Sequence, residues 1–316
     1  MKKLICALLI FLLMFGCFSA CGGTQTDTPE LIVTIFPLYD FAREILGENP
    51  AGLQIGLLEK NGIDLHNFQP SAEDIALIDM AKLFVYIGGE SDEWTQAALE
   101  GKKDGKVCCM MDAVDTLEEQ TVEGMQENDE EEEEEGAADE HIWLSLRNAQ
   151  KMVQSLCDAI CAIDAANEAV YKDNAAAYIQ KLSALDTAYA EAVAQAEQDT
   201  ILVADRFPFR YLAADYDLNY YAAFSGCAAS LDVSFETVAF LSEKLKELKL
   251  PAVLTIDGSD GSVAQTVVSS SGIDAKILTL HSCQCVTAQE LSDGLSYYDI
   301  MSSNLKILKE ALGGWH

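Results

Sequence analysis

The feature that most constrains the fold of this chain is a long amphipathic segment near its middle, residues 167–198. Its apolar side chains recur every three or four residues, as on one face of a helix: Val170, Ala177, Tyr178, Leu182, Leu185, Tyr189 and Val193. At ~1.5 Å per residue, such a helix is roughly 45–50 Å long. We therefore expect one rigid helix that joins the part of the chain before it to the part after it.

Short apolar runs alternate with helical segments on both sides of this helix. The runs predict strands at residues 31–36, 53–58, 83–87, 106–111, 201–204, 220–224, 252–256 and 275–280. Continuous apolar, β-branched runs are typical of strands buried on both faces of a parallel sheet. We predict an α/β fold with two βα lobes, each built on a small, mainly parallel sheet, and a last long helix at 292–312. The ligand site is expected in the cleft between the lobes.

The predicted boundaries follow from these patterns. The N-terminal lobe comprises residues 31–164, the connecting helix 165–199 and the C-terminal lobe 200–316. A leader (1–20) and a polar tether (21–30) precede them.

The N-terminus predicts the compartment. Lys2 and Lys3 precede a short apolar run, the layout of a secretory leader and too short for an ordinary membrane-spanning helix. Phe18-Ser19-Ala20-Cys21 then resembles a bacterial lipobox, in which the cysteine after the cleavage point carries lipid. Cys17 is a weaker second candidate, and a plain secretion leader with an incidental cysteine stays open. We expect a monomer anchored by lipid at Cys21 on the outer face of the cell membrane.

The large negative net charge of the chain limits which classes of partner it can bind. The chain has 316 residues with 20 Lys and Arg against 52 Asp and Glu, a net charge of −32, which argues against nucleic acid as a partner. In the segment 118–140, 13 of 23 residues are acidic. Because such a block repels itself, we expect a disordered surface loop that buries nothing and can be deleted over 123–139. Weak collection of cations by this loop is the alternative.

Three of the four histidines lie just outside apolar segments, at turns between strands and helices: His66, His141 and His281. In open α/β sheets such turns line the ligand crevice. Neutral imidazole is a good ligand for zinc and related divalent ions, and carboxylates complete such sites. The three histidines therefore predict a metal site that the fold assembles from distant segments.

Several motifs along the chain together resemble one family. They are Thr34-Ile35-Phe36-Pro37-Leu38-Tyr39, His66-Asn67-Phe68-Gln69-Pro70-Ser71, Tyr86-Ile87-Gly88-Gly89, His141-Ile142-Trp143-Leu144 and Phe209-Arg210-Tyr211-Leu212. In this order and spacing they resemble the metal-binding lipoproteins of ABC importers, which capture zinc or manganese. The resemblance covers nearly all of the chain after the leader. It implies a solute-binding protein, not an enzyme, that delivers a divalent metal to a membrane permease. The three histidines favour zinc over manganese, which prefers carboxylates.

The resemblance also implies a ligand set. His66 and His141 match the two ligands of the N-terminal lobe, and His281 falls where the family places an aspartate ligand. The remaining family ligand aligns with Arg206, whose guanidinium cannot bind a cation. Asp205, Asp257 or water are the candidates for that fourth position.

Two cysteines lie beside the expected site turns of the C-terminal lobe, Cys227 and Cys283. We predict a disulfide between them that braces the loop carrying His281; thiolate ligation of the metal is the rival interpretation. At the level of function, an extracellular zinc hydrolase and an adhesin-like surface module with a degenerate metal site are the alternatives to the importer component.

Overall fold

The structure is a computed structural model that describes residues 28–60, 62, 65–102, 104–126, 137–228 and 232–314. The predicted leader, both lipidation candidates and His316 lie outside the described residues. Within these ranges, every helix is too short or too polar to cross a lipid bilayer.

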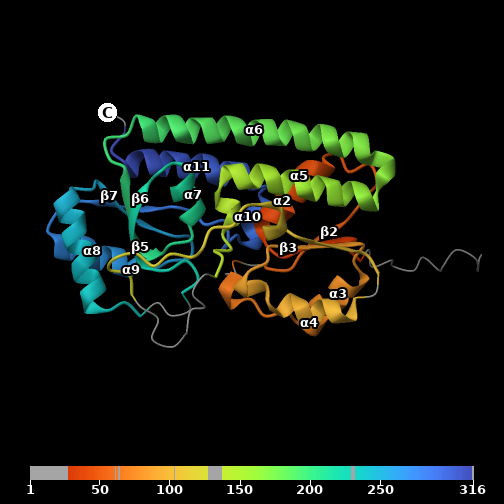
Figure 1. Cartoon of the computed structure of the whole chain (residues 1–316), viewed down its shortest axis with the longest axis horizontal. Coiled ribbons are helices and arrows are strands. Elements are labelled where there is room, and N and C mark those ends of the chain that lie inside the picture. Colours follow the sequence, from red (N-terminus) through yellow and green to blue (C-terminus); the bar gives the residue numbers. More distant parts are fainter. Residues whose placement is uncertain are drawn as a thin grey trace, which may run out of the picture.

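The N-terminal lobe is built on four parallel strands in the order β2-β1-β3-β4. The strands are β1 (Leu31–Val33), β2 (Ile55–Leu57), β3 (Leu83–Tyr86) and β4 (Lys106–Cys109). The helices that cover the sheet are α2 (Phe36–Leu46), α3 (Ala72–Met80), α4 (Trp94–Gly101) and α5 (Leu146–Ile163). Figure 1 shows α2 and α5 on one face and α3 and α4 on the other. Burial on both faces explains why β1 is apolar throughout.

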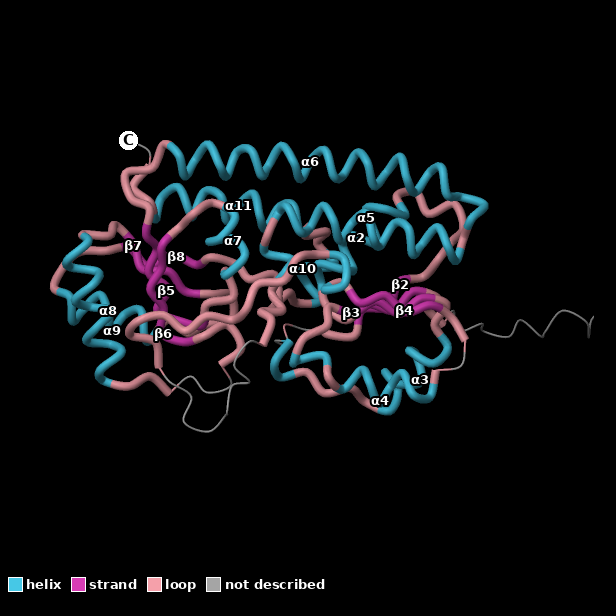
Figure 2. The backbone as a smooth tube through the Cα atoms, viewed as in Figure 1, coloured by secondary structure: helices cyan, strands magenta, loops and turns pink. Residues whose placement is uncertain are grey.

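The C-terminal lobe repeats this topology with the strand order β6-β5-β7-β8, again all parallel. Its strands are β5 (Thr200–Arg206), β6 (Asn219–Phe224), β7 (Ala252–Thr255) and β8 (Lys276–Thr279). Its helices are α7 (Arg210–Asp215), α8 (Phe235–Leu248), α9 (Ser262–Ser271), α10 (Ala288–Ser292) and α11 (Tyr297–Ala311). Figure 2 shows the two sheets as separate bodies. The predicted α/β architecture with two parallel sheets is confirmed.

The connecting helix is α6 (Glu168–Ala194), which runs along both lobes (Figure 1). Its Asn174 donates to the carbonyl of Ile45 in the N-terminal lobe, and Tyr189 donates to the carbonyl of Met301 in the C-terminal lobe. One hydrophobic core includes buried residues of α6 and of both sheets. The two lobes are therefore joined by continuous packing as well as by covalent connection.

Two details of the predicted helices are wrong. The buried stripe of α6 consists of Tyr171, Ala175, Tyr178, Leu182, Leu185 and Tyr189, whereas Val170 is 43% exposed. The last helix begins at Tyr297 and not at Ser292, because a turn with Gly294 at φ +83° separates it from α10. Gly adopts this left-handed conformation at little cost.

The acidic segment is also more ordered at its flanks than its composition predicts. Glu118 pairs with Ala138 in an antiparallel bridge, and the N–H of Gln126 donates to the carbonyl of Ala223. Met125 and Asp139 are buried. The expectation that all of 118–140 is a loop that buries nothing is therefore wrong for residues 118–126 and 137–140. These flanks make backbone hydrogen bonds, and residues 118–126 contact the C-terminal lobe. Residues 127–136 lie outside the described part of the chain.

Candidate metal centre

His66 lies in a short helical turn, Leu65–Asn67, on the connection that follows β2. Leu65 is buried and anchors the turn. On one side of the imidazole, Nδ1 lies 2.8 Å from the Ser91 hydroxyl and 3.2 Å from a carboxylate oxygen of Glu140. Ser91 belongs to the turn after β3, at the carboxyl end of the sheet. The ring orientation of His66 is therefore fixed by groups far from it in sequence.

His141 is completely buried and directly precedes the turn Ile142–Leu144. Its Nδ1 lies 3.0 Å from Asp139 Oδ1. The Tyr211 hydroxyl of α7 donates to the backbone carbonyl of Asp139 at 2.6 Å and so ties this segment to the C-terminal lobe. Burial alone would lower the pKa of His141, but the carboxylates of Asp139 and then Glu140 outweigh burial and raise that pKa.

The two rings face each other through their remaining nitrogens. The Nε2 atoms of His66 and His141 lie 3.3 Å apart. A carboxylate beside Nδ1 favours the tautomer with its proton on Nδ1, which leaves a lone pair on Nε2, as in histidines that bind metals. Two such lone pairs in contact repel each other unless a cation lies between them. In a tetrahedral zinc site with Zn–N of ~2.0–2.1 Å, two nitrogens lie roughly 3.3–3.4 Å apart. The pair therefore has the separation that one zinc ion requires.

Glu140 is the buried carboxylate next to this pair, with 1% of its surface exposed. The N–H and hydroxyl of Ser91 both donate to it. A Cβ at Gly89 would lie 2.7 Å from Glu140, so the backbone at φ +88° can approach the carboxylate only as glycine. Burial opposes ionisation of Glu140, but the neighbouring His66, His141 and Ser91 together lower its pKa. Glu140 is thus a buried carboxylate, stabilised in its ionised form, next to His66 and His141.

Cys227 lies on the other side of Glu140, in the turn after β6. Its Sγ is 3.9 Å from Glu140 Oε1, and ligand atoms of His66, Glu140 and Cys227 all lie within 4.8 Å of one another. Burial, and then the carboxylates of Glu140, Glu119 and Asp139, raise the pKa of the Cys227 thiol. The structure thus brings one soft and two harder ligands together in the part of the chain that it describes.

The predicted disulfide between Cys227 and Cys283 is not formed, and both thiols are free. Cys227 is half-buried beside Glu140, whereas Cys283 is fully buried in the core cluster that also contains Tyr189 and Tyr297. The two cysteines therefore lie in different surroundings.

His281 lies in a second cluster, in the C-terminal lobe. Its Nδ1 accepts a hydrogen bond from the N–H of Cys283 at 2.9 Å and lies 3.2 Å from Asp257 Oδ2. Asp257 itself accepts from the N–H groups of Ser282 and Cys285. The N–H of Cys283 occupies the lone pair of Nδ1, so a proton of this ring lies on Nε2. The Nε2 atom of His281 therefore carries a proton and has no lone pair for a metal, unlike Nε2 of His66 and His141. Asp257 is the carboxylate closest to this ring.

A cavity of about 690 Å³ lies where residues of both lobes meet. Asp205, Arg206 and Asp257 line it from the carboxyl ends of β5 and β7, and Gly62 and Asn67 line it from the N-terminal lobe. Because the strand order reverses between β5 and β7, this is the crevice where α/β sheets bind ligands. Asp205 and Asp257, the two acidic candidates for the fourth ligand, therefore both line the interlobe crevice, as does Arg206.

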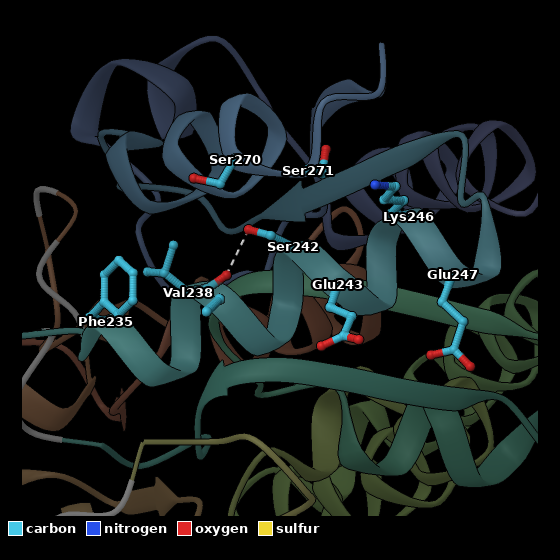
Figure 3. Close-up of a pocket in the computed structure, with 9 residues that line it drawn as sticks. Phe235, Val238, Ser242, Glu243, Lys246, Glu247, Ser270 and Ser271 are labelled. Carbon is cyan, nitrogen blue, oxygen red and sulfur yellow. Dashed lines mark hydrogen bonds between the residues drawn. The ribbon is translucent and has the colours of Figure 1, made fainter.

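A groove of similar volume, about 690 Å³, lies between α8 and α9 of the C-terminal lobe (Figure 3). The described residues that line it include Phe235, Ser242, Glu243 and Lys246, with no histidine or cysteine among them. Figure 3 shows the Ser242 hydroxyl turned to the carbonyl of its own helix at Val238. This groove therefore lacks the ligand chemistry of the interlobe site.

The sequence analysis missed Asp139, Glu140 and Ser91 as members of the site. A signal was present, since Asp139 and Glu140 directly precede His141. It was hidden because both residues end an acidic run that resembles a solvated loop. Ser91 carries no sequence signal of its own.

Comparison with known proteins shows which family the chain belongs to. Residues 31–311 match the family described as zinc-uptake complex component A, periplasmic (ZnuA). The chain belongs to the ZnuA family. The zinc-binding lipoprotein AdcA of Streptococcus pneumoniae is 31% identical over 298 residues, covering 92% of this chain and 58% of AdcA. The chain thus spans little more than half of that relative.

One further relative, and the structure of one domain of AdcA, match this chain along nearly their whole length. The high-affinity zinc uptake system protein ZnuA of Bacillus subtilis is 29% identical over 310 residues, which cover 94% of this chain and 95% of that protein. The crystal structure of the Zn(II)-bound ZnuA-like domain of S. pneumoniae AdcA aligns with a TM-score of 0.73 at 29% identity. This alignment covers 89% of the chain and 98% of the domain.

Proposed function

We propose that this chain captures a divalent metal outside the cytoplasm, zinc in preference to manganese, and delivers it to the permease of an ABC importer. The observation that carries the proposal is the 3.3 Å separation of the Nε2 atoms of His66 and His141, each ring held by a carboxylate. Imidazole nitrogen suits zinc, whereas manganese prefers oxygen ligands. Membership of the ZnuA family and the names of its zinc-binding relatives support the same cargo.

The proposed ligands come from both lobes. His66 and His141 supply the N-terminal half of the site. His281 is the proposed histidine of the C-terminal lobe, and Asp257, Asp205 or water are candidates to complete the shell. The support for His281 is its contact with Asp257, which lines the interlobe crevice. Binding by Nε2 of His281 requires the proton of the neutral ring to move to Nδ1, toward Asp257.

The proposed setting is the outer face of the cell membrane, with lipid on Cys21 as the anchor and a monomeric chain that docks on its permease. AdcA is named as a lipoprotein, and the Bacillus relative is named as part of an uptake system. In this role the protein carries metal and catalyses no reaction. A carrier needs a site that holds its cargo tightly and releases it only at the permease.

The ligand set is tested by zinc titration of the metal-free chain in competition with a chromophoric chelator. His66→Ala and His141→Ala should each weaken zinc binding by at least roughly 10–100-fold, the usual effect of losing even an outer-shell partner. His281→Ala should weaken it as well, whereas the control His316→Ala should not. Equal affinity in wild type and His281→Ala would remove His281 from the site. Equal affinity in all three variants would reject the site.

A further inference from the structure

Cys227 is positioned by contacts that reach it from the N-terminal lobe. Its backbone N–H donates to a carboxylate oxygen of Glu119 at 3.1 Å. The preceding residue, Gly226, lies so close to His141 that an added Cβ would be 3.1 Å from its Cε1. The turn that carries the thiol is therefore held against the histidine pair by two segments that are distant in sequence.

The thiol is also at ligand distance from its neighbours. Cys227 Sγ lies 3.9 Å from Glu140 Oε1, and these two atoms lie within 4.8 Å of a His66 ring nitrogen. In a tetrahedral zinc site with Zn–S of ~2.3 Å and Zn–N of ~2.0–2.1 Å, sulfur and nitrogen lie roughly 3.5 Å apart. A movement of the thiol by roughly 1 Å therefore brings sulfur and imidazole onto one ion.

The surroundings of the thiol favour a cation. Glu140, Glu119 and Asp139 all act on Cys227 electrostatically and are all negative when ionised. At the same time, Arg206 occupies the position where the family resemblance places a second ligand from the C-terminal lobe. A guanidinium cannot ligate a metal. Cys227 belongs to the same lobe and lies beside Glu140 and His66, so its thiol is a further candidate for that position.

We propose that Cys227 is a thiolate ligand of the captured metal, bound together with the Nε2 atoms of His66 and His141, while Glu140 stays beside Nδ1 of His66. The inference rests on the proposed function, because it assumes that this site takes a divalent ion. As the sulfur–metal bond forms, the thiol proton leaves to water. Soft sulfur favours zinc and cadmium and gives manganese no comparable gain, so the cysteine adds selectivity to a site that already prefers zinc.

The test uses Co²⁺ as an optical probe on the reduced, metal-free chain. Wild-type protein should show a near-ultraviolet sulfur-to-cobalt charge-transfer band with one Co²⁺ bound. Cys227→Ser should lose this band, keep its far-ultraviolet circular dichroism and still bind cobalt through the histidines. The control is Cys108→Ser, another half-buried cysteine, which lies in β4 with its thiol beside Ser155 and should keep the band.

Zinc and manganese affinities supply the second readout. Cys227→Ser should weaken zinc binding by at least roughly tenfold, because loss of even an outer-shell partner has an effect of that size. It should change manganese affinity little. Cobalt bound by wild type without the band, or a band that survives Cys227→Ser, would overturn the inference and leave the proposed function standing. Failure of wild type to bind any of the three ions would overturn both.

Discussion

At the scale of single residues, the candidate site depends on carboxylates that hold the proposed ligands in place. Asp139 accepts from both the backbone N–H and Nδ1 of His141, at 2.8 and 3.0 Å. It therefore fixes the orientation of the ring and keeps the lone pair on Nε2. The sequence identified His141 by its residue type, but it could not identify the function of Asp139, which depends on which atoms the turn brings into contact.

Asp139→Asn tests this orienting role without removing a ligand. The amide keeps the size of the carboxylate but loses its charge, so zinc affinity should fall by roughly 10–100-fold while the fold is retained. Zinc titration of the metal-free protein measures the effect. The control is Asp115→Asn, since the Asp115 side chain is fully exposed. An unchanged affinity in Asp139→Asn would show that the carboxylate does not orient His141.

A second buried carboxylate, Asp40, links stability to pH. Burial raises the pKa of Asp40 to about 6, although Arg43 and the N–H of Tyr297 act against it. Because the folded state binds this proton more tightly than the unfolded state, Asp40 contributes most to stability below about pH 4. That contribution is lost as pH rises from about 4 to about 6.

Asp40→Asn removes this dependence. Two pKa units correspond to about 3 kcal/mol, so wild type should lose up to about 3 kcal/mol of unfolding free energy relative to the variant between pH 4 and 7. Urea denaturation of both proteins across this range measures the difference. A difference that stays constant with pH would contradict the assignment.

At the scale of elements, apolar runs predicted the strands because a strand buried on both faces leaves a local signature. The predicted 252–256 is close to the observed β7, Ala252–Thr255. The break before α11 was missed, although its caps are visible in the sequence. Thr287 and Glu290 cap α10, and Ser296 caps α11.

For the acidic segment, the composition predicted disorder, but residues 118–126 and 137–140 are ordered by contacts with residues distant in sequence. Replacing residues 127–136 with a short Gly-Ser linker should leave the unfolding temperature and the zinc affinity unchanged within a few degrees and about twofold. Deleting 123–139 instead removes Met125 and Asp139, which are both buried. Loss of a buried Met side chain alone costs about 2–5 kcal/mol.

Thermal unfolding of the two deletion variants distinguishes these cases. The 123–139 deletion should unfold at clearly lower temperature and bind zinc weakly, since it lacks the partner of His141. Equal stability of the two variants would mean that the flanks contribute nothing, contrary to their hydrogen bonds with the C-terminal lobe.

At the scale of the whole molecule, the two lobes have parallel sheets of equivalent topology, β2-β1-β3-β4 and β6-β5-β7-β8. Turns from both lobes line one crevice. The sequence predicted the two lobes and one site with three histidines, because strand runs and loop histidines are local features. The structure pairs His66 with His141 and places His281 beside Asp257. The sequence could not predict that Cys227 lies beside Glu140, since that depends on how the turn after β6 packs against the N-terminal lobe. The predicted disulfide failed for the same reason.

Metal binding at such a crevice should stabilise the whole chain, because ligands from distant segments come together only in the folded state. The increase in unfolding free energy follows RT ln(1 + [L]/Kd), about 2.7 kcal/mol at a hundredfold excess of zinc over Kd. Urea denaturation with and without zinc measures it. The double variant His66→Ala/His141→Ala should show little of this increase.

The most direct test of the central claim is the zinc content and affinity of the metal-free chain, measured by elemental analysis and by competition between zinc and manganese. The account predicts one zinc per chain, displaced only by a large excess of manganese, and loss of this binding in His66→Ala/His141→Ala. Undiminished zinc binding by that double variant, or a wild-type chain that binds manganese more tightly than zinc, would contradict it.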